Sequence, residues 1–143
     1  MASFNKHNVF VGDLGTKVHD LNGDTFKVLL TNTAPTASNA VKADLTEISA
    51  GNGYTAGGTD TQNTYSASSG TGTMSGTKVV FTASGGTIGA FRYVDIYNDT
   101  PTSPADPLMG WWDYGSSITL NDGETFSVKF NSSDTTGTIA TLA

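Results

Sequence analysis

Alternating hydrophobic and polar positions recur through most of this chain, and a period of two is typical of β-strands. Phe26, Val28 and Leu30 fall on one face of a strand predicted over 25–31. Residues 88–98 are apolar on both faces, which predicts a central strand that is covered twice. Further strands are predicted over 78–83, 108–114, 117–120, 125–130 and 139–142.

Two of these strands carry more detailed expectations. In the strand over 88–98, one face is expected to hold Phe91, Tyr93 and Tyr97, and the other Val94 and Ile96. The tetrapeptide Asn121-Asp122-Gly123-Glu124 predicts a hairpin between 117–120 and 125–130, because Gly123 can adopt a positive φ in a tight turn. Phe126, Val128 and Phe130 should form the buried face of the second strand of that hairpin.

The first 22 residues contain the clearest helical stripe, with apolar residues on one face at Phe10, Leu14, Val18 and Leu21. Gly12 and Gly15 each weaken a helix by about 1 kcal/mol relative to Ala. The segment 1–22 is therefore expected to be either a short helix lying on another surface or an irregular arm. Residues 41–48 favour a second short helix, with a strand as the alternative.

The segment 50–77 consists largely of Gly, Ser, Thr, Asn and Ala. A structureless loop of this length is uncommon in a compact domain. Two interpretations remain: a surface loop, or a Thr-rich edge hairpin that is supported by a neighbouring subunit. The second is favoured, because Thr has a good strand propensity.

Composition and length agree with these elements. Charged residues make up only 14% of the 143 residues, and the hydrophobic fraction is also low. Turn-forming residues make up the difference, and such a composition is typical of short strands joined by many turns. The fold class expected is mainly β: one antiparallel β-sandwich domain over 1–143, with a short N-terminal helix.

The charge and the residue types of the chain exclude several classes of binding partner and site. The net charge of −6 and the seven scattered basic residues disfavour binding to nucleic acid or to an anionic membrane. The chain has no Cys, which excludes disulfides and thiolate metal sites, and no apolar run of the length that a membrane helix requires. A soluble protein made in a host cytoplasm is expected.

The search for catalytic chemistry predicts no enzyme, no cofactor and no metal site. His7 and His19 are the only histidines and are interpreted as solvated surface residues, since no nucleophile motif accompanies them. Asp95, Asp99 and Asp113 lie beside aromatic residues, but turn formation or protection of a sheet edge is the simpler interpretation. The segment 20–24 resembles a calcium loop at alternate positions and lacks its Gly and Glu, so a turn is expected there.

Six aromatic and apolar residues are the candidates for a protein–protein interface. Trp111 and Trp112 are adjacent in a strand, so their side chains must point to opposite faces, and Trp is enriched at interface hot spots. The candidate interface residues are Phe10, Leu14, Tyr54, Tyr65, Trp111 and Trp112.

Five segments, in order, carry a resemblance to a known family. They are VLLTNTAP at 28–35, VKADLTEI at 41–48, GNGYTAGG at 51–58, YNDTP at 97–101 and LMGWWDYG at 108–115. Together they resemble small structural proteins of the virions of tailed bacteriophages and prophages, over about residues 26–130.

The resemblance implies a non-enzymatic component of a virus particle. The function expected is that of a capsid decoration, or cement, protein on the exterior of the head shell. Its expected partners are the major capsid protein and copies of itself in a trimer. The alternative is a tail or fibre component that binds carbohydrate through a loop tip, with exposed Trp and Tyr side chains stacking on sugars near Asp99 and Asp113.

Overall fold

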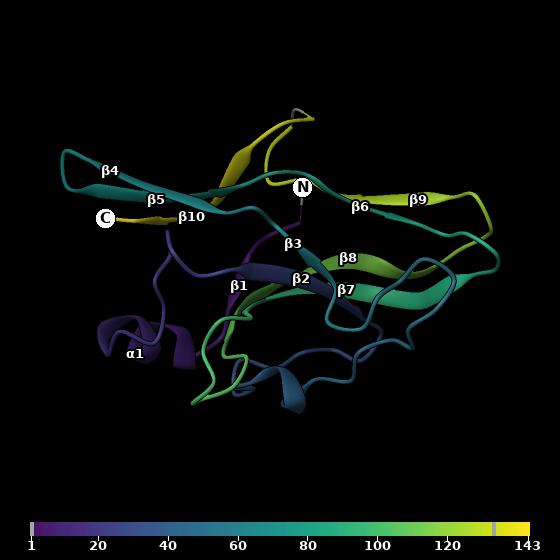
Figure 1. Cartoon of the computed structure of the whole chain (residues 1–143), viewed down its shortest axis with the longest axis horizontal. Helices are drawn as coiled ribbons and strands as arrows, with labels where there is room; N and C mark the ends of the chain where they lie inside the picture. The colour runs from purple at the N-terminus through teal and green to yellow at the C-terminus, as the bar shows by residue number, and fades with distance from the viewer. Residues whose placement is uncertain (1, 133) are drawn as a thin grey trace.

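The computed structural model describes residues 2–132 and 134–143 and contains two layers of antiparallel strands. The lower layer in Figure 1 is a five-stranded sheet in the order β1-β8-β7-β2-β3, and the upper layer holds β10-β5-β4 and β6-β9. The strands are β1 (Asn5–Lys6), β2 (Phe26–Thr31), β3 (Thr59–Asp60), β4 (Thr64–Ser68), β5 (Thr71–Gly76), β6 (Val79–Thr82), β7 (Ile88–Asn98), β8 (Leu108–Leu120), β9 (Thr125–Val128) and β10 (Gly137–Leu142). The helices are α1 (Val9–Gly15) and a 3-10 turn at Lys42–Asp44. The chain is a mainly β, sandwich-like single domain, as predicted.

The two central strands of the lower sheet are buried on both faces. Phe26, Val28 and Leu30 of β2 point into the main core between the layers, which confirms the alternation predicted for this strand. On the opposite face, Leu29 packs with Tyr97 in a second, smaller core. The loops after β2 and before β8 cover this second face from below (Figure 1). Strand β7 lies between β8 and β2 and has the predicted bounds, so the prediction of a central strand covered twice is confirmed.

The predicted faces of β7 are wrong at one residue. Phe91 joins Val94 in the main core rather than sharing the face of Tyr93. The change of face coincides with a bulge or irregularity in the pairing of β7 with β8: Tyr93 pairs with Asp113 and Phe91 with Ile118, so residues 114–117 of β8 stand opposite a single residue of β7. Such an irregularity disrupts the regular ladder, and nothing in the local pattern of apolar residues signals where it falls.

The predicted hairpin around Gly123 is also wrong in its pairing, although its turn forms. Glu124 N donates to Asn121 O at 2.9 Å, and Gly123 has a φ of 88°. However, β8 pairs with β7 and β1, whereas β9 pairs with β6. Gly123 N donates to Ala83 O and Ala83 N donates to Glu124 O, which directs the chain onto β6 in the other layer. The turn therefore connects the two layers, and the strands predicted over 108–114 and 117–120 are one strand, β8.

The segment 50–77 contains the predicted edge hairpin. Strands β4 and β5 pair antiparallel from Thr64 to Ser75, and Ser69 and Gly70 make the turn with φ values of 51° and 81°. Two central residues with positive φ are typical of the tight turns of β-hairpins. The support comes from β10 of the same chain, which pairs with β5 on the other side.

The predicted helices are short. Helix α1 includes Phe10 and Leu14 but ends at Gly15, so Val18 and Leu21 of the predicted stripe lie beyond it. In 41–48 only the turn at Lys42–Asp44 is helical. Short apolar stripes interrupted by Gly specify a helix weakly, because little packing offsets the cost of ordering the backbone.

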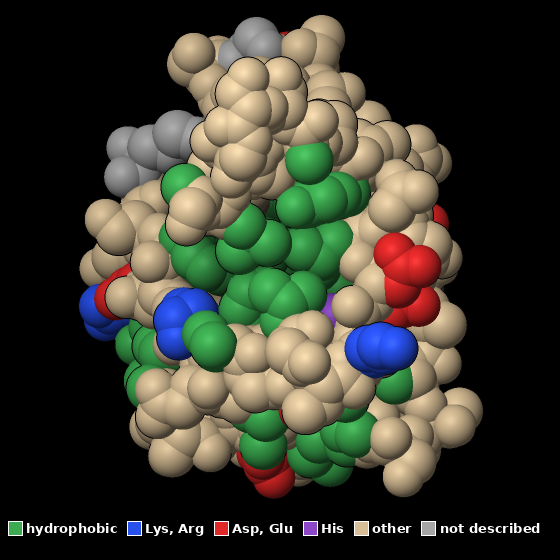
Figure 2. Space-filling model, turned by 90° about the vertical axis from the view of Figure 1, so that its left-hand side faces the viewer, with side chains coloured by type: hydrophobic (Ala, Val, Ile, Leu, Met, Phe, Trp, Pro, Cys, Tyr) green, Lys and Arg blue, Asp and Glu red, His purple; other side chains and the backbone are tan. Residues whose placement is uncertain are grey.

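The end of the sandwich next to α1 carries a hollow of about 420 Å³. Its apolar lining comes from Leu14, Leu21, Tyr65 and Leu142. Figure 2 views the molecule from this end and shows apolar side chains gathered in its middle, with charged side chains at the sides. The upper layer and α1 thus leave apolar surface uncovered where the chain ends.

A candidate interaction site in the open seam

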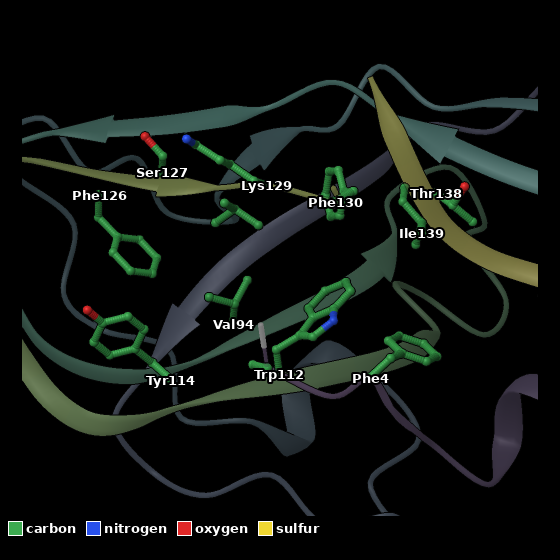
Figure 3. A pocket seen from close by; sticks show the side chains of 12 residues that line it. Phe4, Val94, Trp112, Tyr114, Phe126, Ser127, Lys129, Phe130, Thr138 and Ile139 are labelled. Carbon is green, nitrogen blue, oxygen red and sulfur yellow. The ribbon is translucent and has the colours of Figure 1, made fainter. Parts of the chain in front are cut away.

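The second opening in the sandwich is a seam between β8 in the lower layer and β9 and β10 in the upper layer. A pocket of about 280 Å³ lies in this seam. Figure 3 shows its lining, in which aromatic side chains from both layers face one another. The lining residues are Ala2, Phe4, Val94, Trp112, Tyr114, Phe126, Ser127, Val128, Lys129, Phe130, Thr138 and Ile139. A mostly apolar, concave surface with a few polar groups at its rim is typical of a binding site.

The two tryptophans point to opposite faces of β8, as predicted. Trp112 faces the seam, where its ring lies 5.2 Å from the ring of Phe4 and 5.8 Å from that of Phe130. Trp111 faces the other side, and its ring lies 4.6 Å from that of His7. Only Trp112 therefore contributes to the pocket, and both rings are half-buried.

The bulge in β8 places Tyr114 at the mouth of the pocket. Its ring makes an edge contact with Phe126 at 5.5 Å, and 55% of the residue is exposed. Asp113 holds the start of the bulge, because its carboxylate accepts two hydrogen bonds from Arg92, at 2.8 and 2.9 Å, and one from Gly115 N at 2.8 Å. These bonds lower the pKa of Asp113, with the bond from Arg92 contributing most.

The N-terminal arm fills one end of the seam. Strand β1 pairs with Trp111 and Gly110 of β8, and the ring of Phe4 lies over Gly110. A Cβ atom at Gly110 would lie 2.3 Å from the Phe4 ring, so only glycine permits this approach. An extended segment with an inserted aromatic side chain is thus already part of the seam.

The other predicted interface residues lie elsewhere. Phe10 and Tyr54 are each only 3% exposed and belong to the main core, so in this structure they offer no surface to a partner. The Tyr54 hydroxyl donates to Glu47 Oε1 at 2.7 Å and accepts from Leu30 N at 3.0 Å, which satisfies it within the chain. Leu14 and Tyr65 are half-buried and line the hollow beside α1, and neither of them lines the pocket in the seam.

The histidines were predicted to be solvated, and this is wrong. His7 and Asp95 are both 0% exposed, and His7 Nε2 lies 2.8 Å from Asp95 Oδ2. His7 Nδ1 must donate to Thr36 O at 3.0 Å, because a carbonyl oxygen can only accept. One further proton must therefore lie between Nε2 and Oδ2. Burial raises the pKa of Asp95 to about 6, and His7 opposes this shift.

The pair has a positional role. It joins the N-terminal arm and the loop at Thr36 to the lower face of β7. No reactive side chain is among the hydrogen-bond partners of His7, which are a backbone oxygen and Asp95. The prediction that Asp95 is a turn former or an edge charge is wrong, because it sits in the middle of the central strand.

His19 is 6% exposed and lies between the rings of Phe10 and Phe26. Asn98 Nδ2 lies 3.1 Å from His19 Nδ1, and Asn98 Oδ1 accepts from Thr100 N, which fixes the orientation of the amide. His19 Nδ1 is therefore an acceptor, and the imidazole is neutral. Burial lowers the pKa of His19, while the charges of Asp13 and Asp24 oppose the shift.

The other carboxylates singled out in the sequence form ion pairs or turns. Asp99 lies 2.8 Å from Lys27 Nζ, and Asp113 binds Arg92 on a different face of β8 from Trp112. Asp20 Oδ1 accepts hydrogen bonds from Asn22 N and Gly23 N, which is the predicted turn. Within residues 2–132 and 134–143, no three His, Asp or Glu side chains gather as metal ligands would.

Sequence reasoning found the aromatic residues of β8 and β9 but not the seam between them. Phe126, Val128 and Phe130 do share the face toward the main core, as predicted, and Trp112 was a candidate. Nothing in the sequence around Phe4 or Ile139 indicates that they line a pocket, because the position of the seam depends on which strands pair.

Comparisons with protein-family models, with curated proteins and with solved structures found no match for this chain. None of the helices in the described part of the chain is long and apolar enough to cross a membrane. The seam is therefore interpreted from its own geometry.

Proposed function

We propose that this chain is a structural protein of a bacteriophage virion, a decoration protein that binds the outside of the head shell as a trimer. The observation that carries the proposal is the open seam, which presents Trp112, Tyr114 and Phe126 beside one another at the surface. The resemblance of residues 26–130 to small virion proteins supports the assignment to a phage particle.

The physical task of such a protein is to add interface area across the boundaries between shell subunits. Aromatic side chains in a desolvated pocket dominate the binding energy of many interfaces, and Trp and Tyr are the residues most enriched at such positions. The seam provides a concave apolar centre, and Ser127, Lys129 and Thr138 provide a polar rim. Many copies per shell multiply a modest contact.

The charge of the chain agrees with attachment to another protein rather than self-association alone. A net charge of −6 on 143 residues makes free copies repel one another at long range. Attachment to the shell then concentrates copies at fixed positions, where a trimer can form. The surface of the shell that receives the seam is expected to be neutral or basic around an apolar centre.

The experiment is a binding assay with shells that lack this protein, using sedimentation to separate bound from free chains. Tyr114→Ala is the test variant, and Val11→Ala on α1 is its matched control, because the two residues are 55% and 59% exposed. The wild-type chain and the control should sediment with shells, and Tyr114→Ala should bind at least about tenfold more weakly, as for an interface hot spot.

The position of the chain in the virion distinguishes a decoration protein of the head from a component of the tail or fibres. A reconstruction of the virion should place the chain on the outside of the head in a threefold arrangement. Density at the tail or on fibres, together with binding of the free chain to a glycan array, would replace the decoration role with receptor binding. Failure of the wild-type chain to bind shells would overturn the proposal.

A further inference from the structure

Strand β9 has one edge without a strand partner in the described part of the chain. It pairs with β6 alone, with Phe126 opposite Phe81 and Val128 opposite Val79. Ala83 N donates to Glu124 O, so residue 124 faces β6 with its backbone groups. In an antiparallel pair these groups alternate in direction, which turns the N–H and C=O of Thr125 and Ser127 away from β6.

The unpaired edge of β9 borders the pocket. Phe126, Ser127 and Val128 of β9 all line it, together with Trp112 and Tyr114 of β8 below. Figure 3 shows the side chains of Phe126 and Tyr114 facing each other across the opening between the two ribbons. A strand added to the edge of β9 would therefore lie over the pocket, and every second side chain of that strand would point into it.

Strands β8 and β9 follow one another through a tight turn, yet they pair with different partners. Two strands connected in this way ordinarily form a hairpin. Here they separate into different layers, and the pocket occupies the space between them. The chain's own arm shows how such a space is filled: β1 pairs with β8, and Phe4, the residue before β1, lines the pocket.

We infer that the seam binds an extended segment of a partner protein, which pairs with the outer edge of β9 and inserts alternate apolar side chains between Trp112, Tyr114 and Phe126. This inference rests on the proposed function for the identity of the partner, a subunit of the shell. A peptide backbone is the chemistry that fits, because it alone supplies N–H and C=O groups at the spacing of a strand edge.

The segment is defined by its pattern. Residues that enter the pocket are apolar. Residues between them lie on the face of Ser127, which points away from Phe126 in Figure 3, and they are polar. A sugar or a hydrocarbon chain would use the aromatic surface but would leave the backbone groups of Thr125 and Ser127 unchanged. The state of these two amides therefore separates strand addition from other modes of binding.

The test uses the full chain and short synthetic peptides in which Val or Leu alternates with Thr or Lys. The control peptides have the same composition with the apolar residues grouped together. Hydrogen exchange followed by NMR should show new protection at the amides of Thr125 and Ser127 with alternating peptides only. Equal binding of both peptide sets without protection at these amides, or no binding of either set, would overturn the inference.

A variant gives an independent measurement. Ser127→Pro removes an N–H group that faces away from β6, so the ladder between β6 and β9 is retained and the chain is expected to fold. Ser127→Thr keeps the N–H group and is the matched control. Ser127→Pro should weaken binding of the alternating peptides about tenfold, the value for one or two lost hydrogen bonds. Unchanged binding would contradict strand addition.

The inference and the proposed function fail in different ways. If the chain binds shells and Ser127→Pro binds them equally well, the decoration role stands and strand addition is wrong. If the alternating peptides protect Thr125 and Ser127 but the chain does not bind shells, strand addition stands and the partner is another protein.

Discussion

His7 Nε2 lies 2.8 Å from Asp95 Oδ2, and neither side chain is accessible to solvent. The contact joins a residue of the N-terminal arm to the middle of the central strand β7. The other oxygen of Asp95, Oδ1, has no hydrogen-bond partner among the residues that the structure describes, so the pair depends on the single contact between Oδ2 and His7. The effect of a substitution on stability can therefore be predicted for this pair.

Asp95→Ala should destabilise the chain by about 3 kcal/mol, because it leaves the His7 ring buried without its partner. Asp95→Asn should cost less than about 1 kcal/mol, since its amide can donate to His7 Nε2 while Nδ1 still donates to Thr36 O. Urea unfolding at neutral pH measures both. Equal losses for the two variants would show that the hydrogen bond to His7 contributes little.

The neutral state of His19 predicts a pH dependence of stability. Burial lowers the pKa of His19 below 6.5, so the unfolded chain binds the proton more tightly than the folded chain does. The free energy of unfolding should therefore decrease as the pH falls below about 6.5. In His19→Gln, whose side-chain oxygen can still accept from Asn98, this part of the decrease should disappear. The measurement is the difference between the two curves of unfolding free energy against pH; parallel curves would contradict the assignment.

Gly110 is expected to tolerate no side chain while Phe4 lies over it. Gly110→Ala should destabilise the chain by about 1–3 kcal/mol, because the new Cβ would overlap the Phe4 ring and Asn5 O. In a double-mutant cycle with Phe4→Ala, the cost of Gly110→Ala should be smaller, since one of the two obstacles is absent. Strict additivity of the two substitutions would indicate that the arm does not rest on Gly110.

Arg92 and Asp113 are expected to control the position of the bulge more than the stability of the fold. Both side chains are more than a third exposed, and exposed ion pairs contribute little to stability. In Arg92→Ala the Asp113 carboxyl should titrate at higher pH than in the wild type, because the bond from Arg92 is the main cause of its lowered pKa. An NMR titration measures this directly. An unchanged Asp113 titration would mean that the bond from Gly115 N is sufficient.

Several elements could be predicted from the sequence because their cause is local. The alternation of Phe26, Val28 and Leu30 predicted β2, and the apolar residues on both faces of 88–98 predicted β7 with its observed bounds. The Thr-rich segment predicted the edge hairpin of β4 and β5. In each case the residue types within the segment favour a strand, and in β2 their alternation also indicates which face is buried.

The errors have a different physical origin. The surface prediction for His7 and His19 failed because a polar side chain can be buried when a distant partner satisfies it, and Asp95 and Asn98 are distant in sequence. Phe91 was placed on the wrong face because the pairing of β7 with β8 is irregular between Phe91 and Tyr93. Neither partner is visible in the local pattern.

The sequence alone thus determined a β-rich chain, most of its strands and the turn at Gly123. Only the tertiary structure decided that β8 and β9 separate at this turn, because the choice depends on competition from β7 and β6 for the same strand edges. That competition involves residues far apart in the chain, and its result is the open seam in which Trp112 and Phe126 lie.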